Sequence, residues 1–486
     1  MRTPRTVAMA LLGLFLIAGA AGAVRSPVFE VDHEFYPYYP SLLKWNKSSV
    51  PFNAPEVCGG CHEQQFREWN GSVHSLAFKD PIYQGELVKA VKAVGHDISR
   101  QCEGCHSPVG MMRGEIKGPG LTGLSSLALQ GVSCDVCHSV SGVTHWQTPA
   151  REPENGSLIL SPGVESERGQ KLIKRGPFPP SEDCGGGFHE CVQSGLHLQA
   201  ELCAGCHQVY HHEAHFPLEA TYLEWKHGPY AQRTILCQDC HMVDIGTFKR
   251  VADEYVQPQR EDYRHYFNGA NYLLSFLGAA AATKAGDPAL AESLMKQYAM
   301  AVERLQLAAG LELTPVYHDR RLSEFKVRVS NLRAGHNLPT SLTNVRQMWL
   351  EVVVSDVSGR VLLSSGSVQA DGSLPENTRL FNSDGMGDDL HFAIDPWVVT
   401  AFSRHDTIPP KGYKDAYFGL NLPVDADEVS IEVKLRYRQA DQKVAEALLA
   451  AVPKDINLQQ VYGLSRVPPL PVVDMVSTRS TFAVTR

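Results

Sequence analysis

The sequence predicts two unlike parts joined by a helix: an N-terminal part of short helices and irregular segments built around bound cofactors, and a C-terminal all-β sandwich. Three observations lead to this fold class. All 12 cysteines lie between Cys58 and Cys240. Residues 288–309 carry apolar side chains every three or four positions, as an amphipathic helix does. Beyond this helix, apolar and polar residues alternate, which is typical of half-buried strands.

The N-terminal part contains the pattern Cys-x-x-Cys-His five times. In chain order, motifs 1 to 5 are Cys58-Gly-Gly-Cys61-His62, Cys102-Glu-Gly-Cys105-His106, Cys134-Asp-Val-Cys137-His138, Cys203-Ala-Gly-Cys206-His207 and Cys237-Gln-Asp-Cys240-His241. In a c-type haem site of this pattern, two thiols bond the haem covalently and the histidine is the proximal iron ligand. We therefore expect five covalently bound c-type haems (heme c, iron).

Zinc knuckles and thioredoxin-type redox pairs also use Cys-x-x-Cys. Structural zinc does not require a histidine after every second cysteine. A thioredoxin-like motif would occur once, beside a βαβ pattern that this sequence lacks. Both alternatives are therefore weaker than the haem interpretation.

The first residues resemble an export signal. Arg2 and Arg5 precede an apolar run over 7–20, and Ala21-Gly22-Ala23 is a small-residue cleavage site. We expect a signal peptide over 1–23; the alternative, an uncleaved membrane anchor, has a rather short apolar stretch. The protein is then exported, either to the periplasm or to the cell surface and beyond.

The formal net charge is −8, and loss of Arg2 and Arg5 with the signal peptide makes it two charges more negative. An acidic chain has no electrostatic basis for binding nucleic acid. It favours partners that present basic patches.

We expect four segments: the signal peptide 1–23, a haem domain 24–280, a linking helix 281–310 and a β-sandwich domain 311–486. Asp287 and Pro288 form an N-cap and first-turn signal, and Gly310 is placed to end the helix. Alternation over 325–329 and 429–438 predicts strands, and 349–354 with 361–364 predicts a hairpin. The two short intervals between motifs predict that motifs 2 and 3, and motifs 4 and 5, are neighbours.

Four segments carry a family resemblance. They are Trp69-Asn-Gly-Ser-Val-His74, Gly131-Val-Ser-Cys-Asp-Val-Cys-His138, Thr221-Tyr-Leu-Glu-Trp225 with Cys237-Gln-Asp-Cys-His-Met242, and His265-Tyr-Phe-Asn-Gly269. The chain resembles multihaem cytochromes c of the cytochrome c-554-like group, and Gly335-His-Asn-Leu-Pro-Thr340 resembles the C-terminal part of larger members. The resemblance implies electron transfer through stacked haems, most of them with two histidine ligands.

The sequence does not assign the sixth iron ligands. The resemblance points to His74 and His265, while His189 and His197 compete for one role. The remaining distal candidates are His227 and His145. His336 either binds a haem or forms a hydrogen bond that holds its own loop in place. No role is assigned to the cluster His211, His212 and His215. Met111, Met112 and Met242 are an alternative ligand type that would raise the reduction potential, but histidine is far more abundant here.

Two cysteines are left over. Cys184 and Cys191 are expected to form a disulfide in an oxidising compartment. The alternatives are a sixth haem site, which lacks a following histidine, and free thiols or a metal site.

The sequence favours an electron relay that passes electrons to a redox partner protein or an extracellular acceptor. One alternative is an enzyme in which one haem is five-coordinate and acts on a small nitrogen or sulfur compound. The sequence has no Cys-x-x-Cys-Lys motif of the kind that marks the active haem of pentahaem nitrite reductases. A further alternative is a filament subunit that self-associates through surplus histidines.

Overall fold

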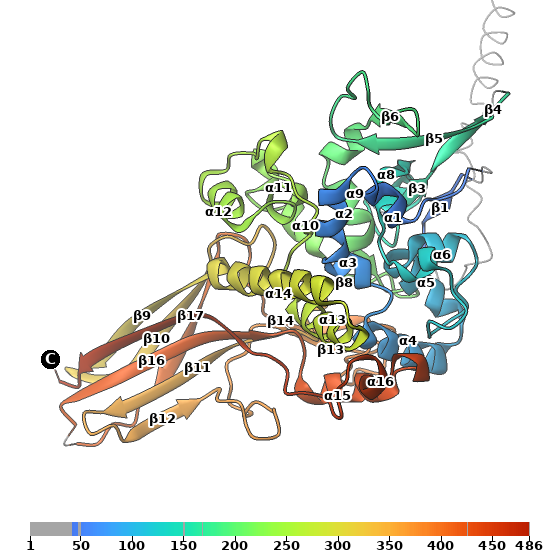
Figure 1. Ribbon diagram of the computed structural model, residues 1–486. Coiled ribbons are helices and arrows are strands. Elements are labelled where there is room, and N and C mark those ends of the chain that lie inside the picture. Colours follow the sequence, from blue (N-terminus) through green and yellow to red (C-terminus); the bar gives the residue numbers. More distant parts are fainter. Residues whose placement is uncertain (1–40, 47–49, 149–150, 168, 425, 486) are drawn as a thin grey trace, which may run out of the picture. The chain divides into compact units, whose positions relative to one another are not determined.

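Short helices linked by irregular segments make up the part of the chain that carries the motifs (Figure 1). The structure is a computed structural model and describes residues 41–46, 50–148, 151–167, 169–424 and 426–485. The predicted signal peptide, 1–23, lies outside the described residues.

Twelve α-helices precede residue 260 within the described residues. They are α1 Pro55–Gly59, α2 Glu63–Asn70, α3 Val73–Leu76, α4 Pro81–Val94, α5 Asp97–His106, α6 Pro108–Met112, α7 Ser126–Leu129, α8 Cys134–His138, α9 Glu201–His207, α10 Thr221–Lys226, α11 Cys237–His241 and α12 Ile245–Glu254. Most are one to three turns long, too short to be stable by themselves in water. Their stability must come from packing and from what they bind.

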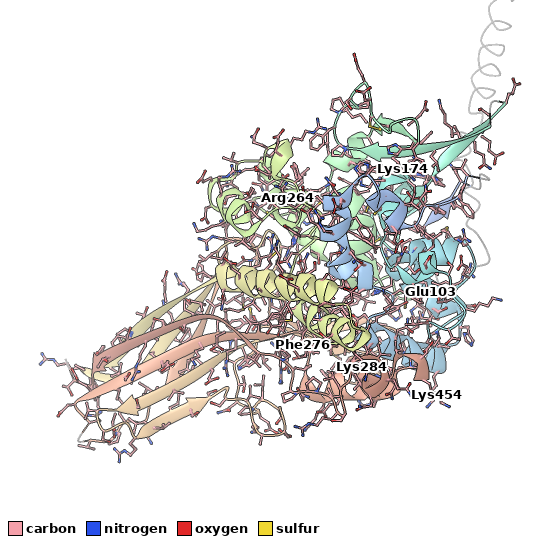
Figure 2. The ribbon with its side chains drawn as sticks, in the orientation of Figure 1. Glu103, Lys174, Arg264, Phe276, Lys284 and Lys454 are labelled. Carbon is pink, nitrogen blue, oxygen red and sulfur yellow. A yellow bond between two sulfur atoms is a disulfide. The ribbon has the colours of Figure 1, made fainter. Side chains whose placement is uncertain are left out.

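Small sheets complete this part. Their strands are β1 Lys44–Trp45, β2 Val140–Val143, β3 Leu158–Leu160, β4 Gly163–Ser166, β5 Gly169–Gly176, β6 Glu190–Gln193, β7 Val209–Tyr210 and β8 Pro217–Glu219. They pair in the orders β1-β3-β2, β4-β5-β6 and β7-β8. Strand β5 is joined to motif 3 by an ion pair between Lys174 and Asp135 of α8 (Figure 2).

Two longer helices, α13 Tyr272–Ala285 and α14 Pro288–Ala308, pack against each other and lead to the strands (Figure 1). The predicted helix start is confirmed, because the Asp287 side chain accepts a hydrogen bond from the Leu290 N–H. The predicted role of Gly310 is wrong. Helix α14 ends at Ala308 and β9 begins at Ala309, since Gly310 already pairs with Ser330 of the next strand.

The C-terminal part is rich in strands. They are β9 Ala309–His318, β10 Arg321–Asn331, β11 Gln347–Asp356, β12 Val361–Ser365, β13 Ser383–Met386, β14 Ala401–His405, β15 Tyr413–Gly419, β16 Glu428–Arg438 and β17 Val473–Ala483. Sheets of order β15-β10-β9 and β12-β11-β16-β17 share one hydrophobic core, and β13 pairs with β14. Two sheets around one core are consistent with the predicted β-sandwich.

The predicted strand alternation is confirmed by burial. Phe325, Val327 and Val329 of β10 are fully buried. In the other sheet, Val354 of β11 lies opposite Ile431 of β16, and both side chains are fully buried. The hairpin of β11 and β12 also has the predicted pairing.

The C-terminal part includes two helices, α15 Gln442–Ala451 and α16 Leu458–Val461, that the sequence did not predict. Helix α15 packs closely on α4, because a Cβ on Gly85 would lie 2.1 Å from the Leu448 carbonyl oxygen. The Asp455 carboxylate accepts hydrogen bonds from the backbone of Leu121 and Thr122. Helix α15 and the segment around Asp455 therefore pack against the haem-motif part.

No helix among the described residues is long and apolar enough to cross a membrane.

The shared core gives a stability prediction. Ile431→Ala should destabilise the protein by about 2–5 kcal/mol, because it leaves a cavity between the two sheets. Thr481→Ala, on the exposed side of neighbouring strand β17, should cost about 0.5 kcal/mol or less. Chemical denaturation followed by circular dichroism measures both. Equal effects of the two substitutions would contradict a core at Ile431.

Candidate haem sites

Each Cys-x-x-Cys-His motif lies on or at the end of a short helix. Motif 1 straddles the end of α1, and motifs 2 to 5 lie in α5, α8, α9 and α11. In a helix, residues three positions apart lie on one face, so the two thiols project together and the histidine follows on the next position. Ten cysteines are free for this bond, two in each motif. This donor set fits covalent haem attachment.

Backbone carbonyls orient three of the motif histidines. Nδ1 of His106 donates to Ala77 O at 2.9 Å, that of His138 to Arg175 O at 2.6 Å, and that of His241 to Asn268 O at 2.8 Å. A ring whose Nδ1 donates to a carbonyl keeps Nε2 for a metal. Burial lowers the pKa of all three rings, so they are neutral at pH 7, the form that binds iron.

Four motif histidines face a second histidine across a narrow gap. The ring centroids are 6.4 Å apart for His62 and His189, 6.3 Å for His207 and His74, 6.2 Å for His138 and His265, and 6.2 Å for His241 and His336. A metal–imidazole bond of about 2 Å on each side of an iron places two ring centroids about 6 Å apart. Each gap therefore has the width that one iron needs.

His138 has a second neighbour, His197, at 5.9 Å. The Nε2 atom of His197 is already bonded to Cys137 O at 3.0 Å, so it is turned toward the backbone. His265 is held through its backbone, because its backbone N–H donates to the buried Glu68 carboxylate at 2.8 Å. Of the two, His265 has the geometry of a ligand opposite His138. His189 lies near His62 of motif 1, whereas His197 lies near His138 of motif 3.

One short segment, 265–268, contacts the surroundings of three motifs. His265 faces motif 3, and the Asn268 carbonyl orients His241 of motif 5. Between them, the Phe267 ring contacts His74, opposite motif 4, at 4.7 Å and His265 at 5.7 Å. Asn268 is itself fixed by Gln297 and Arg304 of α14. Helix α14 thus positions the segment on which three sites depend.

His74 is fixed from the chain around motif 3. The Val132 N–H donates to His74 O at 3.0 Å, and Gly131 approaches so closely that a Cβ would lie 2.3 Å from the same oxygen. Gly131 has a positive φ of 59°, which a glycine adopts without strain. Burial lowers the pKa of His74 to about 3, so its ring is neutral.

Motif 2 differs from the others. Within the described residues, no second histidine faces His106 across such a gap; instead the buried Tyr83 ring stacks on it at 3.9 Å and 6°. Two carboxyl groups, Glu86 and Glu103, lie nearby (Glu103 in Figure 2), and burial raises the pKa of each to about 7. Tyr83 was not predicted as a site residue, because an isolated aromatic residue in a helix usually belongs to the hydrophobic core.

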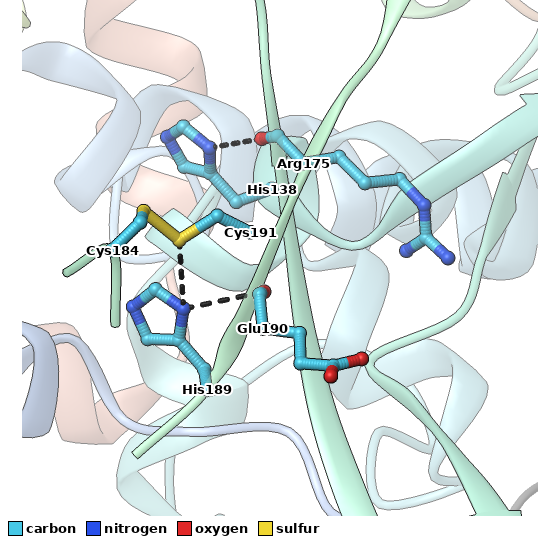
Figure 3. The surroundings of a disulfide bond; sticks show 6 residues. All are labelled: His138, Arg175, Cys184, His189, Glu190 and Cys191. Atoms are coloured by element: carbon cyan, nitrogen blue, oxygen red, sulfur yellow. Dashed lines mark hydrogen bonds between the residues drawn. A yellow bond between two sulfur atoms is a disulfide. The ribbon is translucent and has the colours of Figure 1, made fainter. Parts of the chain in front are cut away.

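The histidine opposite His62, His189, lies in a loop that a disulfide closes. Cys184 and Cys191 are bonded, with Cα atoms 6.1 Å apart, and His189 lies between them in the loop (Figure 3). The His189 Nδ1 lies 3.3 Å from Glu190 O and 3.6 Å from Cys191 Sγ. Gly185 turns the loop with a φ of 82°, where a Cβ would lie 1.9 Å from His189 O. The loop also walls an open pocket of about 820 Å³ with Val50, Leu172 and Phe188.

The other candidates from sequence do not face a motif histidine. His227 is exposed beside a second pocket of about 360 Å³, and His145 begins a short 3₁₀ helix. Met111 is buried in a hydrophobic cluster. His211 donates from Nε2 to Trp397 O, and His215 pairs with the buried Glu154. Within the part of the chain that is described, no group of three or more His, Cys, Asp or Glu is arranged to hold a bare metal ion.

Cysteines of different motifs lie close enough to shift one another's pKa. Cys134 of motif 3 is the largest influence that lowers the pKa of Cys58 of motif 1. Cys206 of motif 4 raises the pKa of Cys105 of motif 2, and Cys237 of motif 5 raises that of Cys203 of motif 4. Motifs 4 and 5 are neighbours as their spacing predicts, whereas the closeness of motifs 2 and 4 was not predicted.

Motif 3 adjoins motif 4 as well. Burial, followed by the nearby Cys206 thiol, raises the pKa of Cys137 to about 12. The five motifs therefore form one connected set in which motif 4 is the neighbour of motifs 2, 3 and 5.

Comparisons with known proteins agree with this chemistry. A family model described as "Cytochrome c554 and c-prime" matches residues 57–139, which include motifs 1 to 3. No curated protein sequence matches the chain. Among solved structures, a penta-heme cytochrome c552 from Thermochromatium tepidum is similar in fold, with a TM-score of 0.57 and 18% identity over 88% of this chain and 99% of that chain. The motifs and the family match support a multihaem cytochrome c with covalently bound haem, and the solved structure supports the fold.

Proposed function

We propose that this chain is a five-haem c-type cytochrome that relays electrons between redox partners. Each haem, when bound, carries one electron by cycling its iron between the ferric and ferrous states. The observation that carries the proposal is the connected set of motifs, in which cysteines of neighbouring motifs lie close enough to shift one another's pKa. Cysteines of adjoining motifs would each attach a haem, so their closeness would bring the haems near one another.

Four of the five sites are bis-histidine in this proposal. At each of these four sites, the motif histidine is opposed by one other histidine ring. The pairs are His62 with His189, His138 with His265, His207 with His74, and His241 with His336. Two imidazole ligands give a lower reduction potential than a His/Met pair. The chain is therefore suited to low-potential electron transfer.

The site of motif 2 supports a second function, that of an enzyme acting on a small nitrogen or sulfur compound. The specific observation is that Tyr83, rather than a second histidine, is the ring in contact with His106 among the described residues. An iron held there by His106 alone keeps its sixth position open. Motif 2 adjoins motif 4, so in this proposal electrons from the other sites reach motif 2 by way of motif 4.

Export and partner choice complete the proposal. The predicted signal peptide and the c-type haem motifs support export of the protein to the periplasm or the cell surface. The formal charge of −8 favours a redox partner with a basic docking face, or an extracellular acceptor.

Spectroscopy and ligand binding test the number and kind of sites. The intact chain should carry five haems by mass. Its ferric form should show four low-spin signals and one high-spin signal in electron paramagnetic resonance, and the reduced form should bind one carbon monoxide per chain. A wholly low-spin protein that binds no carbon monoxide would overturn the open site at motif 2 and leave the relay. Fewer than five haems would overturn the five-haem count.

Substitution tests the ligand opposite motif 4. His74→Ala should remove the second imidazole, so that one of the four low-spin signals becomes high-spin while all five haems remain attached. His145→Ala is the matched control, because His145 faces no motif histidine and its loss should leave the spectrum unchanged. The assignment fails if the two variants behave alike.

Removal of the disulfide tests the ligand opposite motif 1. In Cys184→Ser with Cys191→Ser, the loop that carries His189 loses its covalent closure, so the low-spin signal of motif 1 should weaken or split. Treatment of the unmodified protein with a dithiol should reproduce the change. An unaltered spectrum in both experiments would show that the loop holds His189, or that another residue binds, without the disulfide.

A further inference from the structure

Motif 1 has the most exposed thiol of the five motifs. Cys61 is exposed, whereas the other nine motif cysteines are half-buried. The chain stays exposed from Gly60 to Gln65, so a haem attached at motif 1 keeps one edge in solvent. The cysteines of motif 1 lie near those of motif 3, which places motif 1 at an end of the connected set.

Apolar side chains lie beside this exposed thiol. Val57 precedes Cys61 by about one helical turn and is 49% exposed. Phe188 is 56% exposed and lies in the disulfide loop next to His189, whose ring is 6.4 Å from that of His62. The two segments that hold the opposed rings of motif 1 thus each expose one apolar side chain. Exposed apolar groups beside a cofactor are suited to contact with another protein.

The same two segments are acidic. Residues 53–66 include His62 and residues 176–194 include His189, and together they contain five carboxylates and no Lys or Arg. The whole chain is far more balanced, with 53 acidic and 45 basic residues. All five carboxylates are exposed; they are Glu56, Glu63, Glu182, Asp183 and Glu190. These carboxylates with Val57, Cys61 and Phe188 are called the motif 1 face below.

Most of the negative charge on the motif 1 face is not balanced by ion pairs. Two of the five carboxylates are paired, Glu63 with Arg67 and Glu190 with Lys171 (Glu190 in Figure 3). Glu182 and Asp183 stand directly before Cys184, and neither forms an ion pair within the described part of the chain. The face therefore keeps an excess of negative charge around its apolar side chains.

We propose that the motif 1 face is the docking site of a one-electron redox protein that presents Lys and Arg side chains around the exposed edge of its own cofactor. The carboxylates attract and orient such a partner, and the apolar side chains exclude water from the contact. One electron then passes between the partner's cofactor and the iron at motif 1, so that one is oxidised as the other is reduced and no bond is made or broken. The inference rests on the proposed function in one respect, namely that motif 1 carries a haem of the relay.

A second copy of this chain fits the motif 1 face less well. Two copies that met through this face would place like charges opposite each other, which is unfavourable. The chain as a whole is also acidic, with a formal charge of −8. The charge of the face therefore favours a basic partner over self-association.

Charge reversal tests the docking site. In Glu182→Lys with Asp183→Lys, two exposed carboxylates become cations, so the reduced five-haem protein should reduce a small basic cytochrome c about tenfold more slowly at low ionic strength. Stopped-flow absorbance measures the second-order rate constant. At about 1 M salt, where the Debye length is about 3 Å, the two proteins should react at the same rate.

Asp427→Lys with Glu428→Lys is the matched control. These carboxylates are also adjacent and exposed, but they lie at the start of strand β16 in the two-sheet core. The control makes the same change in total charge and should leave the rate close to that of the unmodified protein. Equal losses in the two variants would overturn the docking site, because only the total charge would then matter.

The unmodified protein separates failure of the docking site from failure of the relay. A five-haem protein that reduces the basic cytochrome c equally fast with and without the charge reversal would overturn the docking site and leave the relay intact. A reduced five-haem protein that passes no electrons to the probe at any ionic strength would instead overturn the proposed function.

Cross-linking locates the contact. A carbodiimide joins carboxylates to lysines, so mass spectrometry of the cross-linked complex with the basic cytochrome c should identify Glu63, Glu182 and Asp183. Cross-links that map mainly to other carboxylates would contradict the docking site. A dimer of the unmodified protein on size exclusion that the charge reversal dissociates would show that a second copy covers the face, and would overturn the basic partner.

The apolar side chains have a separate test. Phe188→Ala removes an exposed ring without changing the charge, so it should weaken the complex about fivefold in salt that screens the carboxylates. Leu390→Ala is the control, because Leu390 is 77% exposed in the strand-rich part. The low-spin signal of motif 1 should persist in Phe188→Ala, which shows that His189 is still in place. Equal affinities of the two variants would contradict an apolar contact at Phe188.

Discussion

In the proposed relay, the haem-motif part depends on one constraint: two imidazole rings must be held about 6 Å apart for one iron to bind both. A backbone carbonyl bonded to Nδ1 orients the ring of His138, His241 and His336. The carbonyls come from distant places, a strand for His138 and the segment before α13 for His241. Short helices of five to ten residues cannot supply such rigidity alone, so the tertiary contacts around each carbonyl do so.

Helix α14 is the element that transmits this rigidity. Gln297 and Arg304 on its buried face hold Asn268, and the same segment presents His265 and Phe267 to motifs 3 and 4. Arg304 is buried and donates to Val243 O as well, which fixes the chain just after motif 5. A helix that looks like a linker in the sequence therefore lies at the centre of the ligand geometry.

The connections among the motifs are not those of a simple line. Cysteines of motif 1 lie near those of motif 3, and motif 4 adjoins motifs 2, 3 and 5. In the proposed relay, motif 4 is then a junction, motif 1 lies beside the disulfide loop at one end, and motif 5 lies under the strand-rich part at another. Motif 2, where the Tyr83 ring stacks on His106 and no second histidine faces it among the described residues, ends the remaining branch.

The sequence by itself determined the cofactor chemistry, because the attachment of a c-type haem depends only on residues within five consecutive positions. It also determined α14 and the alternating strands, whose periodicities of 3.6 and 2 are local properties. Helix α13 escaped prediction because it is apolar on nearly all sides and has no polar face to reveal a period.

Only the tertiary structure decided which histidine faces which motif, because the two rings at one iron come from positions up to about 130 residues apart. His189 and His197 looked like alternatives in the sequence but face different motifs, and His227 and His145 face none. His336 looked equally suited to holding its own loop; in the structure its Nδ1 donates to Asn337 O within that loop, and its ring lies 6.2 Å from that of His241. The physical reason is that a ligand pair is defined by distance and ring direction in space, and neither quantity is written in the spacing of residues along the chain.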